Sequence, residues 1–261
     1  MKAGDSISAN LVEMFRHFAR CRPSGEVREL PGVSIASSGV NLHSFNGAFF
    51  SGLPIEDPGL FARAITIASV HYTARQLRWA FWADEHRLAP SIRKRSDEIF
   101  AAHGMGLSHR NPGMAARRLR PPLRPLPELE VRRVRAQSER LDFAFVNAAA
   151  FGLPFDWCQE LYDLDPLWQD PFAGWVGYVD GRPVTTAAVL AAAGAIGLYC
   201  VGTLDVDRHR GYGEAIVRCA IEHARQDYGI ERVVLESSPA GLNLYEQMGF
   251  RTVRVFSVYS D

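Results

Sequence analysis

The chain has 261 residues, of which 47% are hydrophobic and 22% are charged. It can therefore bury a large core in one or two domains, and these fractions exclude extended disorder and a fibrous protein. Lys and Arg together number 29, as do Asp and Glu, so no net charge would attract the whole molecule to nucleic acid or to an anionic membrane.

Cysteine spacing and hydropathy indicate the environment of the protein. The four cysteines have neither CxxC nor Cys/His metal spacing, and we expect no signal peptide. The sequence therefore predicts reduced thiols in a soluble, cytoplasmic protein without a metal site. An apolar run at residues 185–199 is Ala- and Gly-rich and is interrupted by Gly194 and Gly197, so we expect no membrane span.

The N-terminal half, residues 1–122, carries both strand and helix patterns. Short strand-like segments occur at residues 34–40 and 46–52, and an aromatic one at 77–82. Apolar residues recur at helical spacing over residues 58–74, and a second helix is expected over 90–102. This half is predicted to be mixed α/β.

Prolines mark a boundary after this half. The run PPLRPLPELE cannot continue a helix or a central strand, because each proline lacks a backbone donor and fixes its φ angle. We therefore predict a linker at residues 123–128 and a second domain at 129–261. Seven arginines lie at residues 117–135, but the prolines interrupt them, and we interpret this stretch as a solvated linker and not as a nucleic-acid site.

The C-terminal half has sharper patterns, in the predicted order ββ-β-α-β-α-β. Asp180 and Gly181 suit the positive φ angles of a tight hairpin turn, and Gly229 and Gly249 suit the ends of helices. The expected strands lie at residues 175–179, 183–190, 196–204, 231–236 and 250–259, and the expected helices at 213–229 and 240–248.

The most informative segment is the turn at residues 208–213, RHRGYG, which joins a strand to a helix. A helix N-terminus exposes unpaired N–H groups and a partial positive charge, and glycines let a phosphate approach them. A pyrophosphate would fit this turn, although two glycines alone are also found in ordinary tight connections. The sequence has neither the GxGxxG nor the GxxxxGK[ST] arrangement of nucleotide-binding proteins at this place.

This turn matches the R/Q-x-x-G-x-G/A signature of the GCN5-related N-acetyltransferases (GNAT), with Arg208, Gly211 and Gly213 at the defining positions. The chain resembles that superfamily over residues 129–259, since LESSPAGLNLYEQMGF is similar to its fifth strand, short helix and terminal Gly-Phe. The length also resembles a bacterial form in which a degenerate GNAT-like half precedes the active one. The resemblance implies an α/β fold with a mixed sheet and tandem GNAT-like domains.

The resemblance also assigns a site for acetyl-CoA. The backbone of Val201 and Thr203 would bind the pantetheine arm, a backbone N–H near Val201 would polarise the thioester carbonyl, and Tyr245 would be the general acid. Asp205 departs from the proline of many relatives. The expected cofactor-binding residues are Val201, Gly202, Thr203, Arg208, His209, Arg210, Gly211, Tyr212, Gly213, Glu214, Ala215, Ser238 and Tyr245. No RxxGxG occurs at residues 33–119, so we predict that the N-terminal half binds no CoA.

Several roles stay open at this point. Tyr245 is either the acid or an aromatic core residue, and Arg208 and Arg210 either contact phosphates or are solvated. The general base is Glu236, Asp205, Glu160 or water. Trp157 and Trp168 precede the catalytic strands, where relatives build the acceptor pocket. The acids Asp156, Glu160, Asp163 and Asp165 would suit a cationic amine or an ordinary helix surface.

The sequence thus predicts an enzyme that transfers an acetyl group to a primary amine of a small molecule or peptide. The alternatives are a non-catalytic, CoA-responsive or partner-binding tandem module and an acyltransferase that uses a longer acyl-CoA. The partner is therefore an amine acceptor, with neither nucleic acid nor a membrane expected, and the oligomeric state is left open.

Overall fold

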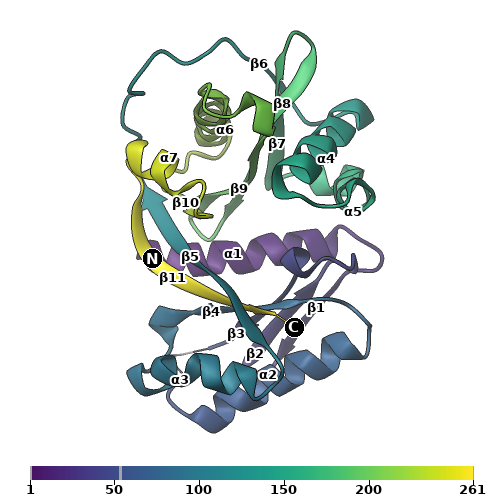
Figure 1. Cartoon of the computed structure of the whole chain (residues 1–261), viewed down its shortest axis with the longest axis vertical. Coiled ribbons are helices and arrows are strands. Elements are labelled where there is room, and N and C mark those ends of the chain that lie inside the picture. Colours follow the sequence, from purple (N-terminus) through teal and green to yellow (C-terminus); the bar gives the residue numbers. More distant parts are fainter. Residues whose placement is uncertain (1, 53–54, 261) are drawn as a thin grey trace. The chain divides into compact units, whose positions relative to one another are not determined.

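The computed structural model describes residues 2–52 and 55–260 and divides into two compact units (Figure 1). Unit 1 comprises Met1–Leu11 and Met114–Arg251, and unit 2 comprises Val12–Gly113 and Thr252–Asp261. The predicted linker at residues 123–128 lies within unit 1 in this division. A separation into domains at that linker therefore stays a prediction.

The strands of unit 1 run in the order β10-β9-β8-β7-β6. Neighbours from β6 to β9 are antiparallel, whereas β10 and β9 are parallel. Asp180 and Gly181, with φ angles of 51° and 74°, form the predicted hairpin turn between β7 and β8. The bounds are β6 Glu130–Arg133, β7 Phe172–Val179, β8 Arg182–Ala192, β9 Ala195–Thr203 and β10 Val233–Glu236.

Helices cover both faces of this sheet. Ala187 of β8 packs in one core cluster with Ile216 of α6, while the adjacent Thr186 meets Asn147 of α4. Successive strand residues point to opposite faces, so α6 and α4 lie on opposite faces. The bounds are α4 Gln137–Phe151, α5 Phe155–Tyr162, α6 Tyr212–Tyr228 and α7 Leu242–Gln247, with 3₁₀ turns at Asp165–Trp168 and Asp205–Asp207.

Unit 2 repeats part of this arrangement, with the strand order β1-β2-β3-β4-β11. The parallel pair is β3 and β4, and the end of β11 pairs antiparallel with β4 from Phe256 to Ser260. The bounds are β1 Glu26–Leu30, β2 Val33–Ser37, β3 Asn46–Phe50, β4 Ala80–Asp84, β5 Gly106–Ala116, β11 Arg251–Ser260, α2 Pro58–Thr73 and α3 Pro90–Ala101, with 3₁₀ turns at His43–Phe45 and Glu85–Arg87.

Aromatic side chains build the core of unit 2 on both faces of its sheet. Phe61 of α2 stacks on Phe50 and meets Phe100 of α3 edge to face. On the other side, Phe15 contacts Phe49 and Trp82. Phe15 belongs to α1 (Ala3–Arg20), a helix that the sequence analysis did not predict and whose first residues, to Leu11, belong to unit 1.

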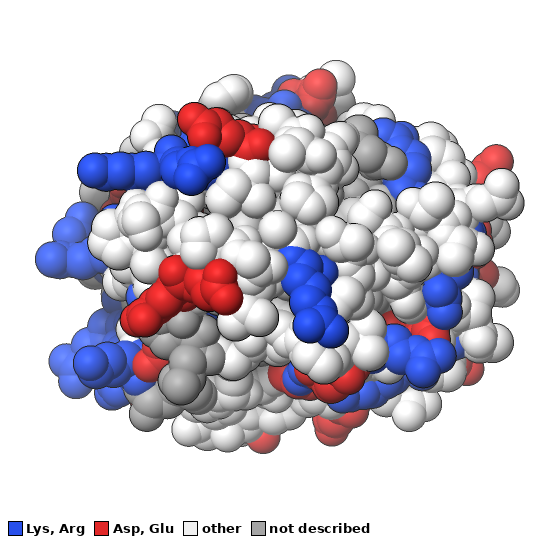
Figure 2. Space-filling view, turned by 90° about the horizontal axis from the view of Figure 1, so that it is seen from below, with Lys and Arg blue, Asp and Glu red and all other residues white. Residues whose placement is uncertain are grey.

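The mixed α/β class is confirmed, and so is the C-terminal order ββ-β-α-β-α-β. Within residues 2–52 and 55–260, none of the helices combines the length and apolar composition needed to cross a membrane. Figure 2 shows that, on the face drawn there, acidic and basic side chains are interspersed among uncharged ones.

Candidate functional site

Strand β9 is bulged near its end, which leaves part of its backbone outside the sheet pairing. Cys200 has a φ of 52°, and the register with β8 shifts between Thr186 and Ala188. The pairing of β9 with β10 runs only over Ile196 and Gly197. The expected pantetheine segment, residues 201–203, therefore lies beyond the part of β9 that pairs with β10, as an added strand on that side would require, while Gly202 and Thr203 still pair with β8.

Two threonines of β8 hold the bulge from the other side. Thr185 Oγ1 donates to the carbonyl oxygen of Gly202 at 2.8 Å, and Thr186 Oγ1 donates to that of Cys200 at 3.0 Å. Asn147 Nδ2 donates in turn to Thr186 Oγ1 at 3.1 Å. Because these side-chain donors of β8 satisfy the two carbonyl groups, the irregular backbone is fixed where the regular register is interrupted.

The N-terminus of α6 has no side-chain cap. Its N-cap residue is Gly211, in the left-handed region with a φ of 91°, and no side chain among the described residues caps it. The first N–H groups of a helix lack intrahelical acceptors, so those of Tyr212, Gly213 and Glu214 stay open to a ligand. A Cβ on Gly213 would lie 3.4 Å from Thr203 Oγ1, so the helix start approaches the end of β9 closely.

Arg208 fixes the position of this loop. Its Nε donates to the carbonyl oxygen of Thr203 at 3.3 Å, one Nη donates to that of Ala150 at 3.2 Å, and its guanidinium is paired with Asp205 at 2.8 Å. The guanidinium thus ties the loop to β9 and α4. Neither open alternative describes it fully, since it is engaged by protein groups and not simply solvated.

Asp207 fixes the same loop by pairing with Arg182. It is buried and accepts two hydrogen bonds from Arg182, at 2.7 and 3.0 Å, and these contacts lower the pKa of its carboxyl. Arg210 lies 3.9 Å from Asp207 and is largely exposed, and His209 has a positive φ of 61°. Arg210 is therefore the arginine of this loop with the weaker hold on protein groups.

Tyr245 packs in the core, and its role as the acid stays a prediction. Its ring packs in the core cluster below α6 and meets Phe250 edge to face at 5.7 Å, and the residue is 7% exposed. Its hydroxyl makes no hydrogen bond to the part of the chain that the structure describes. Burial raises the pKa of Tyr245 above its ordinary value, which keeps the phenol protonated. A buried ring with an uncommitted hydroxyl suits a proton donor.

Ser238 lies in the turn between β10 and α7. Its Oγ accepts a hydrogen bond from the Gly241 N–H at 3.3 Å, and its side chain is exposed. Gly241 has a separate role, since a Cβ there would lie 2.9 Å from the Tyr245 ring. The turn therefore leaves Ser238 available at the surface and gives Tyr245 the space that it occupies.

Glu236, at the end of β10, is less exposed than Asp205 and Glu160, the other two acids that could act as the general base. Asp205 is 76% exposed and paired with Arg208, and Glu160 is exposed on α5. Glu236 has a buried Oε1 without a hydrogen-bond partner, and burial raises its pKa to about 8. A buried carboxyl oxygen without a hydrogen-bond partner is costly, and such groups are concentrated at functional sites.

The aromatic residues before β7 mainly form core. Trp168 is buried against Phe143 and donates from Nε1 to the carbonyl oxygen of Tyr162 at 2.8 Å. Trp157 is half-buried on α5. Tyr162, which the sequence analysis did not single out, lies 3.4 Å from Cys200 Sγ at the bulge.

The acids of this segment differ in their surroundings. Asp163 and Asp165 are both paired with Arg140, whereas Asp156 is exposed on α5. The described residues contain no group of three or more His, Cys, Asp or Glu that could hold a metal ion. The four cysteines are free thiols.

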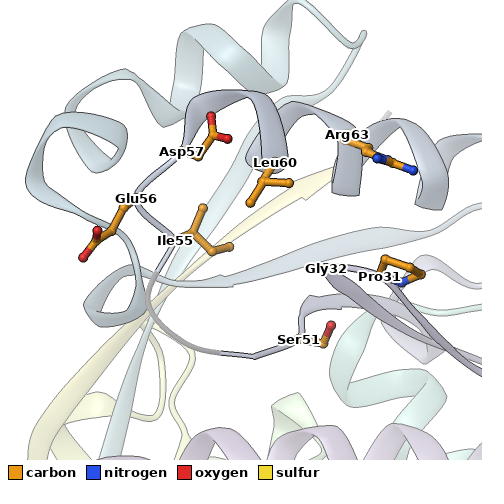
Figure 3. Close-up of a pocket in the computed structure, with 8 residues that line it drawn as sticks. All are labelled: Pro31, Gly32, Ser51, Ile55, Glu56, Asp57, Leu60 and Arg63. Carbon is orange, nitrogen blue, oxygen red and sulfur yellow. The ribbon is translucent and has the colours of Figure 1, made fainter.

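In unit 2, helix α2 starts differently from helix α6 of unit 1. Asp57 caps α2 by accepting a hydrogen bond from the Gly59 N–H at 2.7 Å, and Pro58 removes a further donor. A hollow of about 400 Å³ lies here, with Glu56 and Asp57 among its lining residues (Figure 3). At this helix start the Gly59 N–H is therefore occupied and Pro58 has none, and two carboxylates line the hollow together with Arg63.

Comparisons with known proteins agree with this geometry. Residues 143–250 match the model of the acetyltransferase (GNAT) family. Comparison with curated proteins gives no significant match. Similar solved structures include a GCN5-related N-acetyltransferase from Kribbella flavida, with a TM-score of 0.74 and 20% identity over 99% of this chain and 95% of that chain.

Two further structures share the fold over most of the chain. A GCN5-related N-acetyltransferase from Sphaerobacter thermophilus has a TM-score of 0.60 and 15% identity, over 88% of this chain and 76% of that one. A tandem GNAT protein from the clavulanic acid biosynthesis pathway has a TM-score of 0.55 and 12% identity, over 92% and 84%. At these identities the likeness is one of fold.

Proposed function

We propose that residues 143–250, which match the model of the acetyltransferase (GNAT) family, form a domain that transfers the acetyl group of acetyl-CoA to a primary amine of a small molecule or peptide. The observation that carries the proposal is the uncapped N-terminus of α6, which follows directly on the bulged end of β9. The helix start supplies open backbone donors, and they lie next to the edge of β9 that β10 leaves unpaired.

The described residues fit acetyl-CoA. The N–H groups of Tyr212, Gly213 and Glu214 would face the pyrophosphate, together with the loop residues Arg208 to Gly211. The Ala215 N–H donates to the Gly211 carbonyl oxygen at 3.0 Å and is not among these donors. The backbone of Val201, Gly202 and Thr203 would bind the pantetheine arm, and Ser238 and Tyr245 would border it. When bound, acetyl-CoA supplies the activated acetyl group as a thioester.

Two side chains would handle the protons. Glu236 Oε1, as a carboxylate, accepts the proton that the amine loses as its bond to the acetyl carbon forms. Tyr245 Oη donates a proton to the sulfur as the carbon–sulfur bond breaks, so the products are an N-acetylated amine and free CoA. Exchange with water then returns Glu236 and Tyr245 to their starting states. Burial supports both roles, because it raises the pKa of each group.

An amine-panel assay tests the proposal. Wild-type protein with acetyl-CoA and a set of primary amines should release free CoA thiol, and calorimetry should show CoA binding. Gly213→Asp should lose both signals. Binding of CoA without thiol release across the panel would contradict catalysis and favour the CoA-responsive module, and release only with longer acyl-CoA donors would favour the third alternative.

A further inference from the structure

Asn10, on the part of α1 that belongs to unit 1, forms a buried hydrogen-bond network within that unit. The residue is fully buried, and its Nδ2 donates to the carbonyl oxygens of Leu190, Ala192 and Ala195 at 3.2, 2.8 and 3.1 Å. These carbonyl groups lie where β8 turns into β9. Because the amide nitrogen is committed to them, Asn10 Oδ1 has a fixed direction and needs a donor.

That donor is the hydroxyl of Tyr199. Tyr199 Oη donates to Asn10 Oδ1 at 2.6 Å. A Cβ at Gly197 would collide with both Asn10 and the Tyr199 ring, which places these groups on the same face of β9. The Tyr199 hydroxyl carries one proton, so it cannot donate to a second acceptor while this hydrogen bond is formed.

Glu236 is the neighbouring acceptor that this hydroxyl does not serve. β10 and β9 are parallel, with Val234 opposite Gly197, and two residues further along each strand stand Glu236 and Tyr199. Side chains alternate along strands, so these two point to the same face. Their proximity is also evident in the pKa of Tyr199, which burial raises first and the charge of Glu236 raises further.

The other titratable groups near this network are also engaged elsewhere. Cys200 follows Tyr199 on β9 and contacts the Tyr162 hydroxyl of α5 at 3.4 Å. Arg232, before β10, donates to Ser6 Oγ of α1 at 2.7 Å. Glu236 Oε1 is left without a partner in the described chain.

We propose that Asn10 is a positioning residue for proton transfer, because it holds the Tyr199 hydroxyl and so leaves Glu236 Oε1 without a donor and free to take a proton from the acceptor amine. This inference rests on the proposed function of Glu236. It gives α1 a chemical role, since a residue 226 positions away from Glu236 in the sequence sets the basicity of that group.

The test is the titration of Glu236 in the full-length protein. Carboxyl signals of ¹³C-labelled glutamate are followed by NMR against pH, with Glu236→Gln used to assign the signal. In Asn10→Ala, the Tyr199 hydroxyl loses its acceptor and turns to Glu236, where it stabilises the carboxylate. The midpoint should fall by about one to two pH units, the shift expected from a hydrogen bond to a charged group.

Two variants separate this effect from a general disturbance of α1. Asn10→Asp loses the same amide donors as Asn10→Ala but keeps an acceptor for Tyr199, so its Glu236 midpoint should not fall. Asn10→Ala/Tyr199→Phe removes the competing hydroxyl and should restore the wild-type midpoint. A midpoint that stays lowered in the double variant would overturn the proposal.

Tyr199→Phe alone keeps the proposal testable if Asn10 variants do not fold. The hydroxyl does not serve Glu236, so its removal should leave the midpoint unchanged, whereas a rise would show that Tyr199 donates to Glu236 and would overturn the inference. The acid limb of kcat/KM for the amine should follow the NMR midpoint in each variant. If Glu236→Gln keeps wild-type turnover at every pH, the proposed base is wrong, and the NMR titrations still decide the Asn10–Tyr199 effect separately.

Discussion

The two units contain the same helix-to-strand junction, yet a different aromatic residue stands at it in each unit. In unit 1 the Phe250 N–H donates to the Tyr245 carbonyl at 2.9 Å, and in unit 2 the Met105 N–H donates to the Phe100 carbonyl at 3.0 Å. Gly249 and Gly104 make the same left-handed turn within these junctions. Phe100 therefore occupies in unit 2 the place that Tyr245 has in unit 1.

The two units also differ in the surroundings of the acidic residue that ends a strand of each parallel pair. Asp84 ends β4, is buried, and is paired with Arg254 at 3.7 Å, whereas Glu236 ends β10 with an unbonded Oε1. Unit 1 therefore keeps an energetically costly carboxyl group that unit 2 neutralises. The contrast teaches that the shared fold supplies the positions, and that open hydrogen-bonding groups distinguish a site from a scaffold.

Blocking the open helix start of unit 1 should have the largest effect. Gly213→Asp places a carboxylate in the first turn of α6 and imitates the acidic cap of α2. CoA binding measured by calorimetry should be lost, because the carboxylate takes the N–H groups and repels phosphate. Gly211 is less suited to this test, since its positive φ would strain any side chain.

Gly213→Ala is the matched control. A Cβ at this position meets only ordinary contacts, at 3.4 Å from Thr203 and 3.8 Å from Leu244, so binding should be largely retained. The thermal stability of Gly213→Asp should be equal to or above that of wild type, because an acid near a helix N-terminus contributes about 0.3–1 kcal/mol. Retained CoA affinity in folded Gly213→Asp would contradict the assignment of this loop.

Tyr245→Phe makes unit 1 resemble unit 2 at the junction and should have the next largest effect. The ring that packs against Phe250 is kept, so KM for acetyl-CoA should change little. Loss of the proton donor should lower kcat on the order of 100-fold to 10,000-fold. Steady-state kinetics under conditions where chemistry limits the rate measure this.

If Tyr245 is only a core residue, Tyr245→Phe should keep the wild-type kcat. Since the hydroxyl makes no hydrogen bond to the described chain, its removal should leave the melting temperature near that of wild type in either case. Wild-type kcat in Tyr245→Phe would therefore remove this residue from the mechanism without any ambiguity from unfolding.

Glu236→Gln tests the unpaired acid and should lower kcat about 100-fold, toward the lower end of general-base effects because water can substitute in part. The wild-type rate should rise with pH through about 8, as the carboxyl group loses its proton and becomes a base. That limb of the pH–rate profile should be absent in the variant. A wild-type profile that is flat between pH 6 and 9, with chemistry limiting the rate, would argue against Glu236.

The same substitution should change the pH dependence of stability. The pKa of Glu236 is raised in the folded protein, so the unfolded chain loses this proton at lower pH than the folded one. Wild-type stability should fall as the pH rises from about 4.5 to about 8, by about 1.4 kcal/mol for each unit of pKa difference. Glu236→Gln should therefore melt above wild type at pH 9, with the difference disappearing at pH 4.

The glycine loop, the C-terminal element order and the place of Tyr245 could be predicted from the sequence because they depend on local patterns. Gly211 marks a turn by its conformational freedom, and Gly229 and Gly249 mark helix ends. A preference for Glu236 over Asp205 as the proposed base could not be predicted from the sequence, because it depends on the pairing of Asp205 with Arg208 and on burial, which only the tertiary structure shows.

Contacts between segments that lie far apart in the chain could not be predicted from sequence patterns either. Asn10 meets Tyr199 across 189 positions, and no periodicity connects them. Likewise, residues 256–260 pair with β4 of unit 2, although the sequence analysis placed the last strand in the domain at 129–261. Local propensity predicts that a strand forms but not which neighbour it pairs with.

The smallest effect is expected from removing the cap of unit 2. Asp57→Ala should lower the free energy of unfolding by about 1 kcal/mol, because the Gly59 N–H loses its acceptor, while CoA affinity should stay at the wild-type value. Asp57→Ser keeps a capping oxygen without the charge and should recover most of the lost stability. Denaturant unfolding and calorimetry on the same preparations measure both quantities. Removing one carboxylate should not create a second CoA site, because Pro58 still lacks an N–H and Glu56 still lies beside the helix start. A second CoA bound per chain in Asp57→Ala would instead show that the cap alone keeps unit 2 from binding, and that the difference between the two helix starts is a single side chain.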